Sequence, residues 1–417
     1  MQGLSKLGST AIVYGLCNAL SSATPLLLLP IYTVWLTPAE FGTLSLFSTV
    51  VALAVPVVSL ASGAAVQRRH FNLDSEEFAC YVRTAFLVIV AIGTFIFAVS
   101  LVTAFANKNV VGVSSELFSM AVIVAVAISI QQIILSIWQT EQRISEYIRF
   151  QSFFLLMLIG LPVVFVVILK RGLYGAIAGI VIANVFSSSA MLWPMLRNGL
   201  LLGPVSKKHM FHLLRFGGPL LPHLIAGWVI AMFDRFLIAK YWGLAAVGIY
   251  SFAFQAAQTL SLLSGSFNQA FTPWLYHVLA RGTKDDDSLV SRVLGLYAFV
   301  VIAFGLCVAY LFQVLVPVYA VKYMAALDYA PWLIAGFTIN ALYRISATFQ
   351  MYYERTAEIA VGTVVSGVIS ISMNLYFVKK FGPISAAWSN VIGFGLLFIW
   401  TTFRAITIRD HTFGKDK

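Results

Sequence analysis

Charged side chains inside apolar stretches are the residues of this chain best suited to chemistry in a membrane. Asp234 and Arg235 interrupt an apolar run, residues 213–251, that is long enough to cross a bilayer. A charge near mid-membrane costs at least about 2.5 kcal/mol on insertion scales, so it normally faces a partner or a wet cavity. A carboxylate there can couple to a proton or cation, and a guanidinium can bind an anionic substrate. The structural alternative is an Asp–Arg pair that locks the end of one helix to a neighbour.

Arg344 is the second cation inside an apolar stretch. It lies near the middle of the span predicted over residues 327–352, too deep to reach the interface easily. Asn340 is one helical turn away on the same face. We expect these two side chains to take part in transport, and the alternative is a buried arginine paired with a carboxylate from another helix.

Polar residues form stripes on two predicted spans. Those in the span 245–279 are spaced by three or four residues, so they share one helical face. This stripe consists of Gln258, Ser261, Gly265, Asn268 and Thr272. A similar stripe in and just after the span 116–138 consists of Ser129, Gln132, Ser136, Gln139 and Arg143. Polar stripes line water-filled walls or hold helices together through hydrogen bonds. For the first stripe we favour the water-lined wall.

His223 and Asp234 are the candidates for coupling transport to an ion. With Gly227 between them, their spacing puts all three on one face of the predicted helix, and such a face could line a channel. Asp234 precedes Lys240 by about 9 Å of helix, so it belongs to the outer part of the membrane.

Arg68 and Arg69 end the predicted span 41–66 on its cytoplasmic side. A phosphate-bearing lipid head group would first be met there, so both are candidates for substrate binding. The simpler interpretation is that these arginines set the orientation of the helix in the membrane and contact anionic lipid.

The composition excludes a water-soluble globule. The chain is 60% hydrophobic and 10% charged, whereas a soluble domain has about 25% charged residues. The net charge of +11 does not indicate a nucleic-acid partner, because the basic residues lie between apolar spans. Cys17, Cys80 and Cys307 are too widely separated to indicate a metal site or a disulfide framework. No catalytic or nucleotide-binding motif stands out, so we expect neither an enzyme nor a cofactor.

About twelve apolar segments are long enough to span a membrane, which predicts an all-α polytopic membrane protein. They lie near residues 9–36, 41–66, 81–106, 116–138, 148–169, 172–196, 214–240, 245–279, 291–316, 327–352, 357–378 and 383–404. Most of the 27 Lys and Arg residues fall in loops on the side of the N-terminus, so both termini are expected to be cytoplasmic.

The two halves of the chain repeat each other in three short motifs. The matched pairs are residues 42–45 with 248–251, 140–146 with 352–358, and 170–176 with 380–386. Six helices per half preserve orientation, so the repeats predict two parallel lobes related by an axis along the membrane normal. We expect helices 1–6 in residues 1–200 and helices 7–12 in residues 201–417.

Five segments resemble the lipid-linked polysaccharide flippases of the O-antigen translocase type, within the multidrug and oligosaccharidyl-lipid exporter superfamily. They are LTPAEFGTLSLFSTV at 36–50, SGAAVQRRHF at 62–71, LRFGGPLLP at 214–222, FDRFLIAKYWGLAAVGIYS at 233–251 and AFTPWLY at 270–276. These motifs are apolar and diffuse, so they indicate the superfamily better than the substrate.

The resemblance implies two six-helix lobes around a central cationic cavity that opens alternately to each side of a bacterial inner membrane. The implied cargo is an oligosaccharide on polyprenyl pyrophosphate. Arg235 and Arg344 would attract the pyrophosphate, and the stripes that hold Gln132, Gln258 and Asn268 would bind sugar. The implied partners are the lipid-linked glycan, membrane lipids, and polysaccharide polymerase and chain-length proteins.

Other functions share parts of this pattern. A multidrug antiporter of the same superfamily would have this architecture, but a cavity for cationic drugs should be negative, and Arg235 and Arg344 outweigh Asp234. A membrane-embedded polysaccharide polymerase or glycosyltransferase should carry a large loop with catalytic residues, and the loops here are short. Lipid II flippases of the superfamily usually have two more helices than the twelve expected here. A channel or scaffold would not account for the repeated halves.

Overall fold

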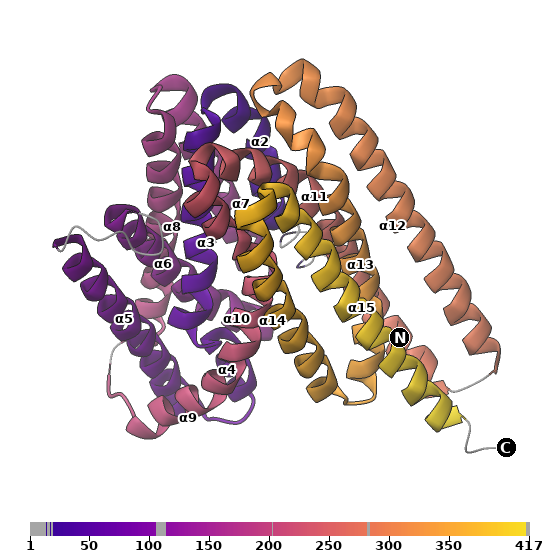
Figure 1. The fold of residues 1–417 in the computed structure, drawn as a ribbon. Coiled ribbons are helices and arrows are strands. Elements are labelled where there is room, and N and C mark those ends of the chain that lie inside the picture. Colours follow the sequence, from indigo (N-terminus) through magenta and orange to yellow (C-terminus); the bar gives the residue numbers. More distant parts are fainter. Residues whose placement is uncertain are drawn as a thin grey trace. The chain divides into compact units, whose positions relative to one another are not determined.

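The described part of the chain is built of α-helices. The computed structural model describes residues 14, 17, 20–105, 114–201, 203–281 and 284–413, and no strand occurs in these ranges. The elements are α2 (Thr24–Trp35), α3 (Pro38–Ser59), α4 (Ser62–His70), α5 (Ser75–Phe105), α6 (Ser115–Thr140), α7 (Ile144–Val163), η1 (Val164–Ile168), α8 (Gly172–Arg197), α9 (Lys207–Gly217), η2 (Gly218–Leu220), α10 (Leu221–Met232), α11 (Asp234–Arg281), α12 (Lys284–Tyr319), η3 (Val321–Asp328), α13 (Ala330–Tyr352), α14 (Thr356–Phe381) and α15 (Pro383–Phe413) (Figure 1).

The helices form two compact units. The N-terminal unit runs Glu40–Trp228 and contains most of α3, the elements from α4 to α9, and α10 as far as Trp228. The C-terminal unit contains the end of α10 and α11 to α15 together with α2, which packs against α11. Helix α2 thus belongs to the C-terminal unit, and α9 and most of α10 belong to the N-terminal unit. The boundary expected at residues 200/201 stays a prediction for the lobes.

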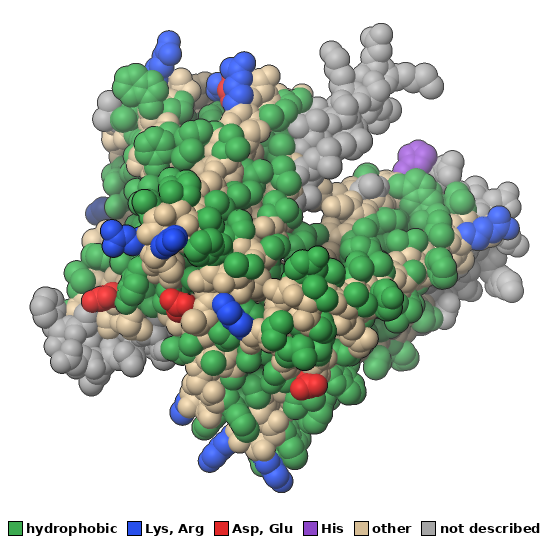
Figure 2. All heavy atoms as spheres, turned by 90° about the horizontal axis from the view of Figure 1, so that it is seen from above, with side chains coloured by type: hydrophobic (Ala, Val, Ile, Leu, Met, Phe, Trp, Pro, Cys, Tyr) green, Lys and Arg blue, Asp and Glu red, His purple; other side chains and the backbone are tan. Residues whose placement is uncertain are grey.

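Most of the expected membrane spans are present in the described ranges. Nine helical stretches there are long and apolar enough to cross a membrane, and one of them, Lys207–Gln269, covers the predicted span 214–240 and most of 245–279. The first part of the predicted span 9–36 lies outside the described residues, and its described part, Leu20–Trp35, is a shorter apolar helix. The predicted span 327–352 corresponds to the helix α13, which is not among the nine. Hydrophobic side chains are widespread on the face shown in Figure 2. The all-α polytopic fold class is confirmed.

Helix α11 folds back on itself at Gly243. This glycine has φ 82° and ψ 173°, a conformation that only glycine adopts readily. Tyr250 and Asp234 are hydrogen-bonded although a straight helix would hold them about 24 Å apart. The chain therefore reverses at Gly243, between the two predicted spans 214–240 and 245–279.

The predicted span 41–66 is wrong as a single continuous helix. Helix α3 ends at Ser59 and α4 begins at Ser62, because Leu60 and Ala61 have φ values of 46° and 54°. Gly217 of α9 packs against this break so closely that a Cβ atom there would lie 2.1 Å from the Leu60 carbonyl oxygen. Hydropathy does not record backbone dihedrals, so the break could not be predicted from the apolar pattern.

Two of the three sequence repeats share a backbone conformation. Gln142 and Glu354 have φ values of 55° and 58°, and each stands just before an Arg that pairs with a Glu three residues later. Gly172 and Gly382 have φ values of 55° and 79° at the start of the next helix in each unit. The repeated motifs thus form matching turns in the two units.

Candidate functional site

Arg344 lies half-buried on α13 in the C-terminal unit. Its Nε atom donates to Asn340 Oδ1 at 3.5 Å, as expected of side chains one turn apart on one face. The ion pairs of the described part of this unit join Arg235 to Asp234, and Arg355 and Arg404 to Glu358. Arg344 takes part in none of them. Within the described ranges, its guanidinium is therefore not neutralised by a carboxylate.

Asn268 of the α11 stripe meets α13 next to Arg344. The Thr348 hydroxyl lies 3.0 Å from Asn268 Oδ1 and 2.9 Å from the Arg344 carbonyl oxygen. On the other side, Tyr297 of α12 donates to the carbonyl oxygen of Ala341 at 3.2 Å. These contacts hold the backbone of α13 from two helices, so the Arg344 side chain extends from a fixed position.

The polar stripe of α11 forms an open face. Gln258, Ser261, Gly265, Asn268 and Thr272 are all partly exposed. Leu260, Ser264 and Leu275, which lie along the edge of this stripe, are completely buried. A Cβ atom at Gly265 would meet nothing within 4 Å, so this face has space beside it. Such a face is available to hydrogen-bond a polar substrate.

The stripe of α6 in the N-terminal unit mostly contacts neighbouring helices. Ser129 is buried and donates to its own helix, Ser136 packs against Gly63, and Gln139 bonds with Gln67 and Tyr147. Arg143 pairs with Glu146 at 2.9 Å, and that hydrogen bond raises the pKa of Arg143. Only Gln132 of this stripe is well exposed. The stripe as a whole therefore serves helix packing, and Gln132 alone stays a candidate for substrate binding.

Asp234 and Arg235 are buried inside the C-terminal unit, with 2% and 3% of their surface exposed. Their charged groups lie 3.8 Å apart. Arg235 donates to Ser251 Oγ at 3.4 Å and to the Ala231 carbonyl oxygen at 3.2 Å, and its Cζ atom lies 4.1 Å from the centre of the Phe254 ring.

The contacts of this pair reach across the α11 hairpin, because Tyr250, Ser251 and Phe254 follow the reversal at Gly243. The geometry thus matches the structural alternative, in which the pair locks two helical segments together. Binding of substrate by Arg235 and ion coupling by Asp234 stay predictions, and neither side chain is open to a ligand in this conformation.

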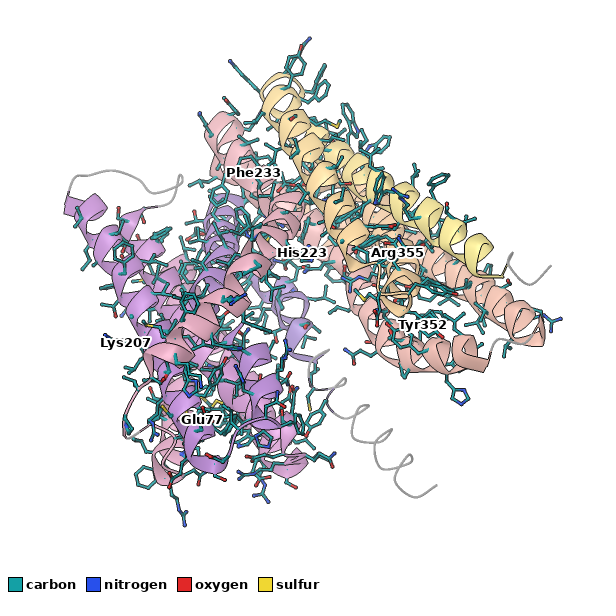
Figure 3. All side chains as sticks on the ribbon, turned by 90° about the horizontal axis from the view of Figure 1, so that it is seen from below. Glu77, Lys207, His223, Phe233, Tyr352 and Arg355 are labelled. Atoms are coloured by element: carbon teal, nitrogen blue, oxygen red, sulfur yellow. The ribbon has the colours of Figure 1, made fainter. Side chains whose placement is uncertain are left out.

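His223 lies exposed on α10 in the N-terminal unit and is labelled in Figure 3. The expected continuous face that it shares with Asp234 is wrong, because α10 ends at Met232 and α11 begins at Asp234. Phe233 separates the two helices, and the two candidates belong to different units.

Arg68 and Arg69 end α4, and Arg68 is the more exposed. A polar cluster lies near them, where Tyr81 of α5 meets α9: the Tyr81 hydroxyl is 3.0 Å from His212 Nδ1. Glu77 is 3.9 Å from Lys208 at the same end of the unit, and Figure 3 labels Glu77 and the neighbouring Lys207. These two arginines therefore belong to the N-terminal unit, and Arg344 belongs to the C-terminal unit.

The sequence does not predict an apolar groove that the structure contains, because the walls of this groove come from three separate helices. It lies within the C-terminal unit and has a volume of about 460 Å³. Leu29 and Pro30 of α2, Phe252 of α11, and Leu311 and Tyr319 of α12 are among its lining residues. Its wall is almost wholly apolar, so it fits a hydrocarbon chain rather than a sugar.

The described helices are long and apolar enough to form a multi-pass membrane protein, and they carry a half-buried arginine beside a polar stripe. The fold is similar to that of an inward-facing multidrug resistance MATE family transporter of the MOP superfamily, with a TM-score of 0.67, 15% identity and coverage of 93% of this chain and 95% of that one. It is also similar to the lipid II flippase MurJ in an inward closed conformation, with a TM-score of 0.72, 12% identity and coverage of 93% and 87%.

The chain belongs to the polysaccharide biosynthesis protein family, which matches residues 7–278. It is 23% identical over 379 residues to "Lsg locus putative protein 1" of Haemophilus influenzae, covering 88% of this chain and 90% of the relative. The resemblance identified from the sequence is confirmed at the level of family and superfamily fold.

Proposed function

We propose that this protein moves polyprenyl-pyrophosphate-linked oligosaccharide units from the cytoplasmic to the outer leaflet by alternating access. The cargo would be a repeat unit of O-antigen, capsule or exopolysaccharide. The observation that carries the proposal is Arg344, a cation within an apolar span that no described carboxylate neutralises. It stands beside the open polar face of α11.

Arg344 would bind the pyrophosphate. A guanidinium presents a planar set of donors that matches phosphate oxygens in two-point contacts, and the bond is charge-assisted. Asn340, whose Oδ1 accepts from Arg344 Nε, would orient the guanidinium.

The sugar would bind along α11. Gln258 and Asn268 supply amide donors and acceptors on the open face. Gln132 of the N-terminal unit remains a separate candidate for sugar contact. The apolar groove of α2, α11 and α12 suits a section of the prenyl chain. The three parts of the cargo thus have chemically matched surfaces among the described residues.

The membrane potential would assist export. About two negative charges moving outward across an inside-negative potential of 100 mV gain about 2.3 kcal/mol each. Asp234 and His223 remain the candidates if a proton or cation is also coupled. We place the protein in a bacterial inner membrane with both termini cytoplasmic, where polysaccharide polymerase and chain-length proteins would act on its product.

A multidrug antiporter is the second candidate, since the fold is similar to a MATE transporter. Such a site should hold cationic drugs with a carboxylate. The described polar face of α11 and the Arg344 region present amides, hydroxyls and a guanidinium instead, which favours an anionic cargo.

The test is deletion of the gene followed by mass spectrometry of the lipid-linked molecules that accumulate. A polyprenyl-linked glycan on the cytoplasmic leaflet, cleared when the gene is restored, is the expected result. Unchanged lipid-linked glycans together with increased drug sensitivity would instead establish the antiporter.

A further inference from the structure

An aromatic-walled groove lies within the C-terminal unit, where α13, α14 and α15 pack together near the α14–α15 turn. Its volume is about 530 Å³. Trp332 stands 6.2 Å from Trp388 and Phe381 stands 6.4 Å from Trp388, measured between ring centres. Met373 and Phe377 complete the α14 wall. The hydroxyl of Ser385 in the groove is bonded to the Gly382 carbonyl oxygen, so the groove offers an apolar lining.

One cation stands beside the wall of this groove, and a second is its neighbour in the chain. Lys379 and Lys380 occupy the last turn of α14 and are both exposed. The ammonium of Lys380 lies 5.3 Å from the centre of the Phe381 ring, which is itself part of the groove wall. Neither lysine takes part in an ion pair within the described ranges. An apolar groove and unpaired cations therefore lie side by side.

We propose that this groove binds an anionic glycerophospholipid of the surrounding membrane. One acyl chain lies between Trp332, Phe381 and Trp388, the phosphate contacts Lys380, and the neighbouring Lys379 adds to the positive potential. The positive charges select an anionic head group, because each lysine near a membrane surface attracts acidic lipid. The volume lies within the range of about 300–1,000 Å³ that holds one compact ligand, which fits a single acyl chain. The proposal does not depend on the proposed function.

The first experiment is native mass spectrometry of the full-length protein in detergent, titrated with phosphatidylglycerol or phosphatidylcholine. The wild type should retain phosphatidylglycerol preferentially, and the Lys379→Gln/Lys380→Gln variant should bind it about thirtyfold more weakly. The matched control is Lys170→Gln/Arg171→Gln, which removes two cations at the repeated turn of the N-terminal unit. It should bind as the wild type does. Equal loss in both variants, or equal retention of the two lipids, would overturn the proposal.

The second experiment locates the acyl chain. A few equivalents of phosphatidylglycerol with brominated chains should quench tryptophan fluorescence, and Trp388→Phe should remove a large part of the quenching. Trp193→Phe, at an exposed position on α8 in the other unit, should leave it unchanged. If polyprenyl phosphate displaces the brominated lipid at lower concentration, the groove belongs to the prenyl lipid and the proposal is wrong.

Discussion

Thr348 Oγ1 lies 3.0 Å from Asn268 Oδ1 and thereby joins α13 to the polar face of α11. Arg344 is one turn before Thr348 on α13, and the same hydroxyl also approaches its carbonyl oxygen. The proposed phosphate-binding side chain and the proposed sugar-binding face are thus held in one rigid arrangement within a single unit. The energetic coupling between Thr348 and Asn268 can therefore be measured with single and double variants.

Replacing Thr348 by Val should lower transport about tenfold at normal protein levels, because a typical hydrogen bond contributes about 1 kcal/mol and this one positions two parts of the site. Asn268→Ala should lower transport further, because it also removes a proposed sugar contact. The double variant should be little worse than Asn268→Ala alone, since the Thr348–Asn268 bond is already lost in that variant. Fully additive losses in the measured export rate would show that the two residues act independently.

Replacing Tyr250 by Phe should destabilise the protein without changing how the folded molecule binds its cargo. The change removes the hydroxyl that donates to Asp234 and leaves a buried carboxylate with one fewer partner, which costs about 1–3 kcal/mol. Thermal unfolding in detergent measures the loss, and cargo affinity is measured on the folded fraction. Unchanged stability with weakened cargo binding would instead assign the Asp234–Arg235 cluster to the transport site.

Gly217→Ala should destabilise the N-terminal unit, because its Cβ atom would lie 2.1 Å from the Leu60 carbonyl oxygen. Overpacking of this kind costs about 1–3 kcal/mol or more. Gly218→Ala is the matched control, since nothing lies within 4 Å of its Cβ position. Equal melting temperatures for the two variants would mean that α9 does not pack against the break between α3 and α4.

Arg143→Gln and Arg355→Gln should each change stability by less than about 1 kcal/mol, because their pairs with Glu146 and Glu358 are partly exposed to solvent. Since the two turns repeat each other, the two variants should also behave alike. Denaturation in mild detergent would measure both. A large loss for only one of them would show that the repeated turns have different roles.

The sequence was sufficient for the spans, the turn near Gly243 and the repeated motifs, because hydropathy and loop signals are local. The break at Leu60 and Ala61 could not be predicted from the sequence, since apolar residues with positive φ have no distinctive sequence pattern. The contacts of Arg235 could not be predicted from the sequence either. They depend on Ser251 and Phe254, which approach only after the chain has reversed.

The stripe on α6 illustrates a different limit. Its spacing is as regular as that of the α11 stripe, yet Ser136 and Gln139 pack against α4 while Asn268 stands on an open face. Helical spacing shows that polar residues share one face of a helix. It does not show whether a neighbouring helix covers that face, because this depends on tertiary packing.

The central claim is that Arg344 binds the pyrophosphate of a lipid-linked glycan, and its most direct test is the lipid-linked glycan content of a deletion strain that carries Arg344→Ala. The variant should reach the membrane at the wild-type level, yet the glycan should accumulate on the cytoplasmic leaflet as in the deletion, with Arg344→Lys restoring part of the export. Normal export by Arg344→Ala at equal protein abundance would contradict the account.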